Sequence, residues 1–209
     1  NQIYGVKMQK IDEKQDNEMR SDCPVCNSEN TLVVTNKTDN IPYFGNILET
    51  AVRCEKCGYQ SADNICLDHH DPSRYTLKID TQKLNSRVAK SQTATLTIPE
   101  LGLKVEPGSK SQGYVSNVEG ILNRFEDAVN QALLLNDGND EIQDNALAIL
   151  RNIFAVKSGD KTVDLILEDP FGNSMIDDDD AKMEILTQQE AESLETGFTI
   201  IDEDDLEDE

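Results

Sequence analysis

Four cysteines fall into two closely spaced pairs, Cys23-Pro-Val-Cys26 and Cys54-Glu-Lys-Cys57, separated by residues 27–53. Each pair turns the chain so that two thiolates face one point, and two such turns supply the four soft ligands of a tetrahedral zinc ion. Four sulfur ligands leave no coordination position open for water, so the site is of the structural kind. The pattern therefore predicts one structural zinc ion whose binding energy contributes to folding.

Two other uses of the cysteine pairs are less favoured than zinc binding. Disulfide bonds would require an oxidising compartment, and the chain shows neither a signal-peptide pattern nor the cysteine density of a secreted scaffold. A thioredoxin-like redox pair would open a helix after a strand, which neither pair does. We therefore favour a zinc site and expect a cytoplasmic protein.

Three more residues of metal-ligand type follow the pairs: Cys66, His69 and His70. Cys66 could act as a fifth, replaceable ligand, although a buried free thiol is the more common role of a single cysteine. Adjacent side chains of an extended segment point to opposite faces, so two neighbouring histidines chelate a metal poorly. We interpret residues 64–74 as a linker.

The composition limits the classes of function. The chain has 209 residues, 37% of them hydrophobic, and a formal net charge of −22, which allows one substantial core and a small added module. No run of about 18 apolar residues occurs, so a membrane-spanning helix is excluded. The charge argues against a general nucleic-acid binder, because phosphate neutralisation requires clustered Lys and Arg. The acidic runs at 177–180 and 202–209 are interpreted as solvated segments, the second as a tail, with attraction to a basic partner as the alternative.

The N-terminal part of the chain reads as a zinc module at 21–64 preceded by a lead-in at 1–20. Residues 31–35 and 46–53 are rich in strand-forming residues, and a turn cluster lies between them. These features predict a two-stranded arm with the zinc site at its base. The long separation of the cysteine pairs predicts that the hairpin projects well beyond the metal.

The rest of the chain alternates between strand and helix patterns. Strand patterns occur at 75–80, 93–98, 101–105, 163–167 and 175–176. Between them, Asn117 is a predicted N-cap, and two helical apolar stripes follow, the second containing Ile142, Ala146, Ile149, Leu150, Ile153 and Phe154. Strands before and after a helical pair predict a mainly β (α+β) domain at 75–201, a β-sandwich with a helical hairpin at about 117–157.

An ordered set of short motifs spans most of the chain. These are Cys23-Pro-Val-Cys26, Ile41-Pro-Tyr-Phe-Gly45, Cys54-Glu-Lys-Cys-Gly-Tyr59, Asn85-Ser-Arg-Val-Ala-Lys-Ser91, Thr97-Ile-Pro-Glu100, Val118-Glu-Gly120, Gly172-Asn-Ser174, Leu186-Thr and Thr196-Gly-Phe198. With these motifs the chain resembles the ZPR-type zinc-finger proteins, in an archaeal-like form with one copy of the unit. The resemblance implies a four-cysteine zinc finger or ribbon followed by a jelly-roll-like β-sandwich, a double-stranded β-helix, with a helical hairpin insertion.

The resemblance also implies a partner. It implies binding to translation elongation factor 1-alpha, with assistance to the folding or nucleotide-dependent maturation of that factor. Ile41, Tyr43 and Phe44 are candidate partner-binding residues, because exposed aromatic and aliphatic side chains commonly anchor interfaces. The alternative for Tyr43 and Phe44 is packing within the protein. We expect a monomer.

Other functions have less support. The chain contains no phosphate loop, GxSxG elbow or HExxH pair, so we expect no enzymatic activity, no catalytic residues and no cofactor besides zinc. The main alternative is a zinc ribbon that binds nucleic acid or the transcription apparatus, for which the finger offers only Lys37, Arg53 and Lys56 as nearby cations.

Two of the motifs carry competing interpretations. The segment at 85–91 is either a partner-facing loop or the start of a strand with Arg87 paired to a carboxylate, and we favour the second. Gly172 and Asn173 are interpreted as turn residues.

Overall fold

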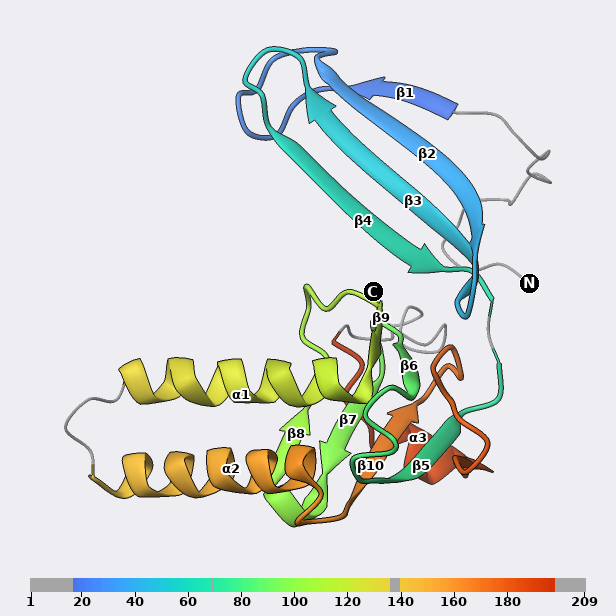
Figure 1. Ribbon diagram of the computed structural model, residues 1–209. Helices are drawn as coiled ribbons and strands as arrows, with labels where there is room; N and C mark the ends of the chain where they lie inside the picture. The colour runs from blue at the N-terminus through green and yellow to red at the C-terminus, as the bar shows by residue number, and fades with distance from the viewer. Residues whose placement is uncertain (1–16, 69, 136–139, 198–209) are drawn as a thin grey trace. The chain divides into compact units, whose positions relative to one another are not determined.

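The computed structural model describes residues 17–68, 70–135 and 140–197. The chain divides into two compact units, residues 1–68 and 69–209 (Figure 1). The predicted tail at 202–209 and residues 1–16 of the predicted lead-in lie outside the described residues. None of the helices among the described residues is long and apolar enough to cross a membrane.

The first unit is a four-stranded antiparallel sheet in the order β1-β2-β3-β4. Its strands are β1 (Asn17–Ser21), β2 (Leu32–Ile41), β3 (Gly45–Cys54) and β4 (Gln60–Cys66). The two predicted strands are present as β2 and β3, but each is longer than expected. The start of the predicted linker was wrong, because residues 64–66 belong to β4.

The long β2–β3 hairpin confirms the predicted projection. The two strands pair from Leu32 opposite Cys54 to Ile41 opposite Gly45, and each contains 10 residues. At about 3.3 Å per residue the hairpin carries its turn about 30 Å from the end that holds Cys54. The first unit therefore has a metal-binding end and a distant tip.

The second unit is mainly β, as predicted. A five-stranded sheet has the order β12-β5-β10-β7-β8 and a three-stranded sheet the order β11-β6-β9. The strands are β5 (Ser73–Ile79), β6 (Arg87–Lys90), β7 (Thr95–Ile98), β8 (Leu103–Val105), β9 (Tyr114–Asn117), β10 (Val163–Asp169), β11 (Met175–Asp177) and β12 (Lys182–Ile185), with a 3-10 turn, η1 (Pro99–Leu101), before β8.

Two long helices lie between β9 and β10, as the apolar periodicity predicted. They are α1 (Val118–Leu135) and α2 (Asp140–Ser158). The Asn117 side chain accepts a hydrogen bond of 2.8 Å from the Gly120 amide, which confirms the predicted N-cap. A short third helix, α3 (Gln188–Glu192), was not expected, although its capping box is visible in the sequence as Thr187 followed by Glu190.

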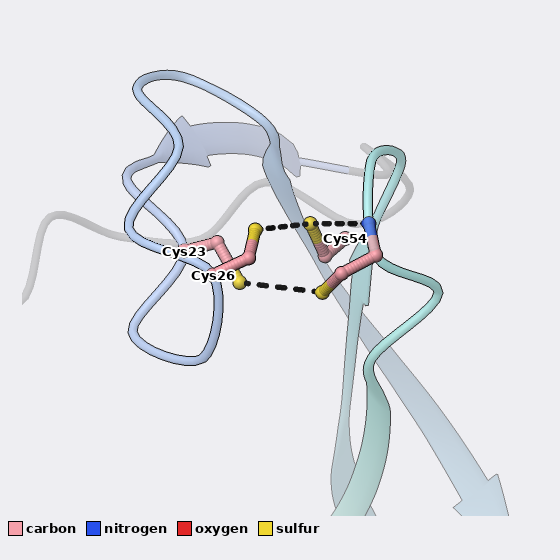
Figure 2. Close-up of side chains that lie close together, drawn as sticks. Cys23, Cys26 and Cys54 are labelled. Atoms are coloured by element: carbon pink, nitrogen blue, oxygen red, sulfur yellow. Dashed lines mark hydrogen bonds between the residues drawn. The ribbon is translucent and has the colours of Figure 1, made fainter.

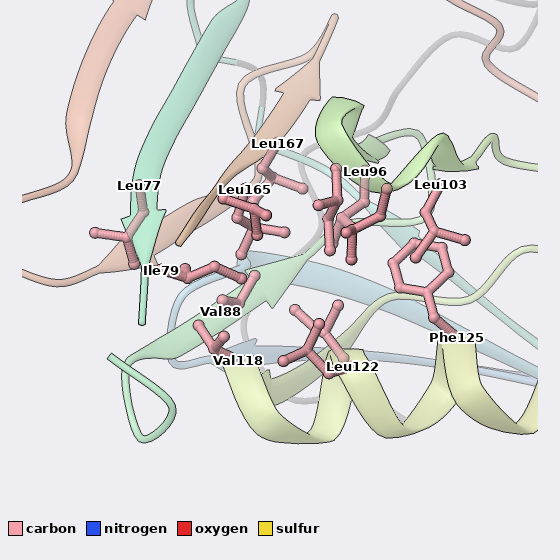
Figure 3. Packing of buried hydrophobic residues seen from close by; sticks show 14 of the residues in the cluster. Leu77, Ile79, Val88, Leu96, Leu103, Val118, Leu122, Phe125, Leu165 and Leu167 are labelled. Atoms are coloured by element: carbon pink, nitrogen blue, oxygen red, sulfur yellow. The ribbon is translucent and has the colours of Figure 1, made fainter. Parts of the chain in front are cut away.

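One apolar core holds the second unit together. Side chains from β5, β6, β7, β10 and the first half of α1 converge in it (Figure 3). The labelled members are Leu77, Ile79, Val88, Leu96, Leu103, Val118, Leu122, Phe125, Leu165 and Leu167. In β10 every second residue is buried, so the strand lies on the core with one face, as its alternating pattern indicated.

Candidate functional site

The four paired cysteines come together at one end of the first unit. Their sulfur atoms all lie within 4.8 Å of one another. Two separations, Cys23 Sγ to Cys57 Sγ and Cys26 Sγ to Cys54 Sγ, are 3.8 Å each (Figure 2). A tetrahedral zinc ion with bonds of about 2.3 Å places its sulfur ligands about 3.8 Å apart. The four cysteines are therefore positioned to bind one zinc ion.

Local backbone turns present these thiols. The Cys23 carbonyl accepts a 2.8 Å hydrogen bond from the Asn27 amide, and the Cys54 carbonyl accepts one of 3.1 Å from the Gly58 amide. Each turn reverses at a residue with positive φ, Asn27 at 51° and Gly58 at 76°. Asparagine and glycine tolerate this conformation better than other residues, which explains their place directly after each cysteine pair.

Hydrogen-bonding groups favour the thiolate form of two of the four cysteines, Cys54 and Cys26. The Thr31 hydroxyl lies 3.5 Å from Cys54 Sγ, and the Cys57 amide donates to the same sulfur at 3.5 Å. These two contacts lower the pKa of Cys54 to about 6. The Ser28 hydroxyl, 3.3 Å from Cys26 Sγ, lowers the pKa of Cys26. A deprotonated sulfur is the form that binds zinc, so these contacts prepare Cys54 and Cys26 to act as zinc ligands.

The additional candidate ligands lie elsewhere. Cys66 is a half-buried residue of β4 opposite Ile47 and is not among the clustered cysteines. His70 is exposed in the second unit, and His69 is outside the described residues. Within the part of the chain that the structure describes, no other group of three or more His, Cys, Asp or Glu side chains lies within ligand reach of a common metal.

The tip of the β2–β3 hairpin contains the three candidate partner-binding residues. Ile41, Tyr43 and Phe44 are each half-buried. The Phe44 amide donates a 3.1 Å hydrogen bond to the Ile41 carbonyl, and Tyr43 has φ of 75°. This is a type II turn in which Tyr43 occupies the position that normally requires glycine. A non-glycine residue in this region costs about 1–3 kcal/mol, a strain that often marks a functional position.

The tip is fixed by contacts with the end of the same unit. The Asn46 amide donates a 2.8 Å hydrogen bond to the Asp68 carboxylate. Gly45 follows the turn with φ of 68°, and a Cβ atom there would overlap the same carboxylate. Gly45 therefore permits the close approach that holds the tip turn in place.

A second apolar surface lies on α2. The side chains of Leu147 and Phe154 are 48% and 70% exposed. With Leu150 and Arg151 they line a hollow of about 360 Å³. The inclusion of Phe154 in the core-facing stripe was wrong, because positions 147, 150, 151 and 154 form a separate stripe at helical spacing.

Two of the sequence motifs meet at a buried carboxylate that the sequence did not reveal. Asp169 at the end of β10 is fully buried. Its oxygens accept hydrogen bonds from the hydroxyls of Ser91 (2.7 Å), Thr93 (2.9 Å) and Ser174 (2.6 Å). They also accept bonds from the backbone amides of residues 171 and 173. The network ties the turn after β10 to the segment after β6, so both motifs hold the fold together.

The first of these motifs also contains a buried lysine. Lys90 is 2% exposed, and its ammonium donates a 3.1 Å hydrogen bond to the Ser91 carbonyl. Burial lowers its pKa to about 8. The motif forms strand β6, as favoured from the sequence, and Arg87 is exposed at its start. Because Lys90 is buried, it cannot contact a partner from this position.

Comparisons with known proteins agree with this arrangement. A family model described as the ZPR1 zinc-finger domain matches residues 17–64. A second, described as the ZPR1 jelly-roll domain, matches residues 82–197. The matched regions correspond to the four-cysteine sheet and to the β domain with its helices.

Several relatives extend over most of the chain. An uncharacterised ZPR1-like protein of Methanocaldococcus jannaschii is 41% identical over 90% of this chain and 94% of its own length. A similar protein of Pyrococcus horikoshii is 36% identical over 88% of this chain and 84% of its own length. The zinc finger chaperone zpr1 of Schizosaccharomyces pombe is 28% identical over 79% of this chain but only 37% of its own length. The chain therefore belongs to the ZPR1 family of zinc-finger proteins.

Proposed function

We propose that this protein binds translation elongation factor 1-alpha, or the homologous aminoacyl-tRNA-carrying GTPase of an archaeon, and assists its folding or nucleotide-dependent maturation. The fission yeast relative is named a zinc finger chaperone, and this chain matches both ZPR1 domain models. A closed four-thiolate site contributes stability to a binding module and offers zinc no position for catalysis.

The conformation of the finger tip carries the proposal. A tight turn presents Tyr43 at φ of 75°, between Pro42 and Phe44, far from the stabilising zinc end. Folding stability alone favours glycine at this position, so the strained tyrosine indicates a role for its ring at the surface. Rigidly held aromatic side chains lose little conformational entropy on binding and commonly form hot spots.

Charge favours a basic protein client over nucleic acid. The chain carries a formal net charge of −22, which attracts a basic, RNA-binding client and competes with its RNA. Within the finger, Arg20 forms ion pairs with Glu18 and Glu55, and Lys37 pairs with Asp39. These pairs neutralise cations that phosphate binding would require, so the nucleic-acid alternative is less favoured.

The exposed stripe on α2 is consistent with the same activity. Leu147 and Phe154 present apolar surface on the second unit, and Arg151 lies between them. An incompletely folded client exposes apolar segments that such a surface can cover. We propose this stripe as a secondary contact that adds to the finger tip.

The experiment that tests the proposal is equilibrium binding of zinc-loaded protein to purified elongation factor 1-alpha from the same organism, with GDP, with GTP and without nucleotide. A double variant, Tyr43→Ala with Phe44→Ala, is expected to weaken binding at least about tenfold, or about 1.4 kcal/mol. Met19→Ala, an exposed apolar residue of β1 near the zinc end, serves as the matched control and is expected to leave the affinity unchanged. Absence of binding in every nucleotide state would contradict the proposal.

A further inference from the structure

Strand β4 forms a free edge of the finger sheet. It pairs with β3 on one side, and no described strand pairs with its other side (Figure 1). All six residues from Gln60 to Ile65 are exposed on both faces of the sheet. A strand edge of this length is a template for another extended chain unless the protein covers it.

The hydrogen bonds at the two ends of the β3–β4 ladder show which residues of β4 bond to β3 and which do not. The Cys54 amide donates to the Tyr59 carbonyl at 2.7 Å, and the Leu67 amide donates to the Asn46 carbonyl at 2.8 Å. Residues that bond to the neighbouring strand alternate with residues that do not in an antiparallel ladder. Both end bonds involve odd-numbered residues of the β4 side, so positions 61, 63 and 65 also bond to β3.

The intervening residues direct their backbone groups away from the sheet. Gln60, Ala62 and Asn64 therefore present amide donors and carbonyl acceptors along the free edge. The Asn64 amide donates a 2.9 Å hydrogen bond to the carboxylate of its neighbour Asp63. This local bond partly shields the Asn64 amide in the absence of a partner, while the backbone amide and carbonyl of Ala62 stay available to a pairing strand.

The side chains beside this edge specify what a pairing strand should contain. Asp63 and Ile65 lie on one face of β4. Toward a strand added at the free edge they occupy non-hydrogen-bonded positions, where the side chains of directly opposite residues are closest to each other. In an antiparallel partner, a basic residue opposite Asp63 forms a cross-strand ion pair. The residue two positions earlier then lies opposite Ile65, whose exposed apolar side chain favours an apolar neighbour.

A second copy of this chain is a poor occupant of the edge. Antiparallel pairing of β4 with itself over the whole strand would be centred on Asp63, placing the two aspartates directly opposite each other. Like charges in this position are destabilising. The formal net charge of −22 on each copy adds repulsion.

We propose that β4 binds an extended, basic segment of another polypeptide by antiparallel strand addition, with an apolar residue two positions before a Lys or Arg. Backbone hydrogen bonds from Gln60, Ala62 and Asn64 give the affinity, and Asp63 and Ile65 select the sequence. This surface is distinct from the hairpin tip, and the inference does not depend on the identity of the client proposed above.

A designed peptide tests the inference directly. The probe is a labelled nonapeptide with blocked ends, Thr-Val-Thr-Ile-Thr-Lys-Thr-Val-Thr, titrated with the zinc-loaded full chain in fluorescence anisotropy. Replacement of its lysine by glutamate is expected to weaken binding at least about tenfold, because an attraction to Asp63 becomes a repulsion. N-methylation of the peptide amides that face β4 is expected to abolish binding, whereas methylation of the opposite amides is expected to preserve it.

Variants of the protein test the same pairing from the other side. Ala62→Pro removes an outward donor without removing a bond to β3, so the finger is expected to keep its fold and zinc while losing the peptide. Ala62→Val, which keeps the donor, is the matched control and is expected to bind. Asp63→Lys is expected to reverse the preference, so that the glutamate peptide binds more tightly than the lysine peptide.

Three results would overturn the inference. These are equal binding of the two N-methylated peptides, unchanged binding by Ala62→Pro with bound zinc, and a concentration-dependent dimer in sedimentation whose β4 amides become protected from exchange. The last result would assign the edge to a second copy of the chain instead.

Discussion

Removal of zinc is expected to unfold the finger while the β domain stays folded. Outside the cysteine cluster, the finger buries only a few large aliphatic side chains among its described residues, namely Leu32, Val33 and Ile47. Their burial contributes about 5 to 9 kcal/mol at about 1.5 to 3 kcal/mol each. A four-thiolate zinc ion contributes about 10 to 16 kcal/mol, so the larger share of the stabilisation comes from the metal. The second unit has its own apolar core and needs none of this contribution.

Hydrogen exchange followed by mass spectrometry measures the loss of folded structure on zinc removal separately for each unit. After chelation, amides of β2 and β3 are expected to lose protection, while those of β5 and β10 keep it. The variant Cys54→Ser is expected to give the same pattern without a chelator. Cys66→Ser, which changes a cysteine outside the cluster, is the matched control and is expected to keep both the zinc and the protection.

Two outcomes would refute this reasoning. Full protection of β2 and β3 in a sample shown to be free of zinc would mean that the small aliphatic core suffices. Parallel loss of protection in β5 and β10 would mean that the two compact units fold as one. Either result would require a different account of what stabilises the finger.

Further expectations concern buried and strained positions of the β domain. Burial lowers the pKa of Lys90 to about 8 from 10.5. Between pH 8 and pH 10.5 the unfolded chain therefore binds more protons than the folded chain. The free energy of unfolding should rise by about 3 kcal/mol as the pH increases through this range. Denaturation of Lys90→Met should show no such rise. Hydrogen bonds from Lys83 and the Ser86 hydroxyl lower the pKa of Asp178 to about 2 from 3.8. The stabilisation that the ionised Asp178 gives above about pH 4 should therefore be lost as the pH falls toward about 2. In the variant Lys83→Met, NMR titration should show a higher pKa for Asp178. Gly172 has φ of 63°, and a Cβ there would overlap a backbone carbonyl, so Gly172→Ala should lower the free energy of unfolding by about 2 kcal/mol or more, whereas Gly108→Ala, in open space, should have little effect.

Features that depend on local chemistry could be predicted from the sequence. The convergence of the two cysteine pairs could be predicted, because two pairs of thiols at this short spacing match the tetrahedral four-sulfur coordination of zinc and have few other uses. The cap at Asn117 and the apolar stripes of α1 depend on residues three and four apart, so periodicity reveals them. The β2–β3 hairpin was likewise indicated by β-rich segments on both sides of a turn cluster.

Features that depend on distant partners could not be predicted. Strand β4 is polar and exposed on both faces, so it lacks the alternation that indicates a strand, and its pairing with β3 alone defines it. Asp169 looks like an ordinary turn residue until Ser91 and Ser174 are brought to it by the sheet. Phe154 fits the core-facing stripe by spacing, and only packing of the neighbouring helix shows that it lies outside.

The most direct test of the proposed chaperone activity is the yield of nucleotide-binding elongation factor 1-alpha recovered when the denatured factor is refolded with this protein. The account predicts a higher yield with zinc-loaded protein, a reduced yield with the Tyr43→Ala/Phe44→Ala variant, and an undiminished yield with Met19→Ala. A yield that is the same with and without the zinc-loaded protein would contradict the proposed function.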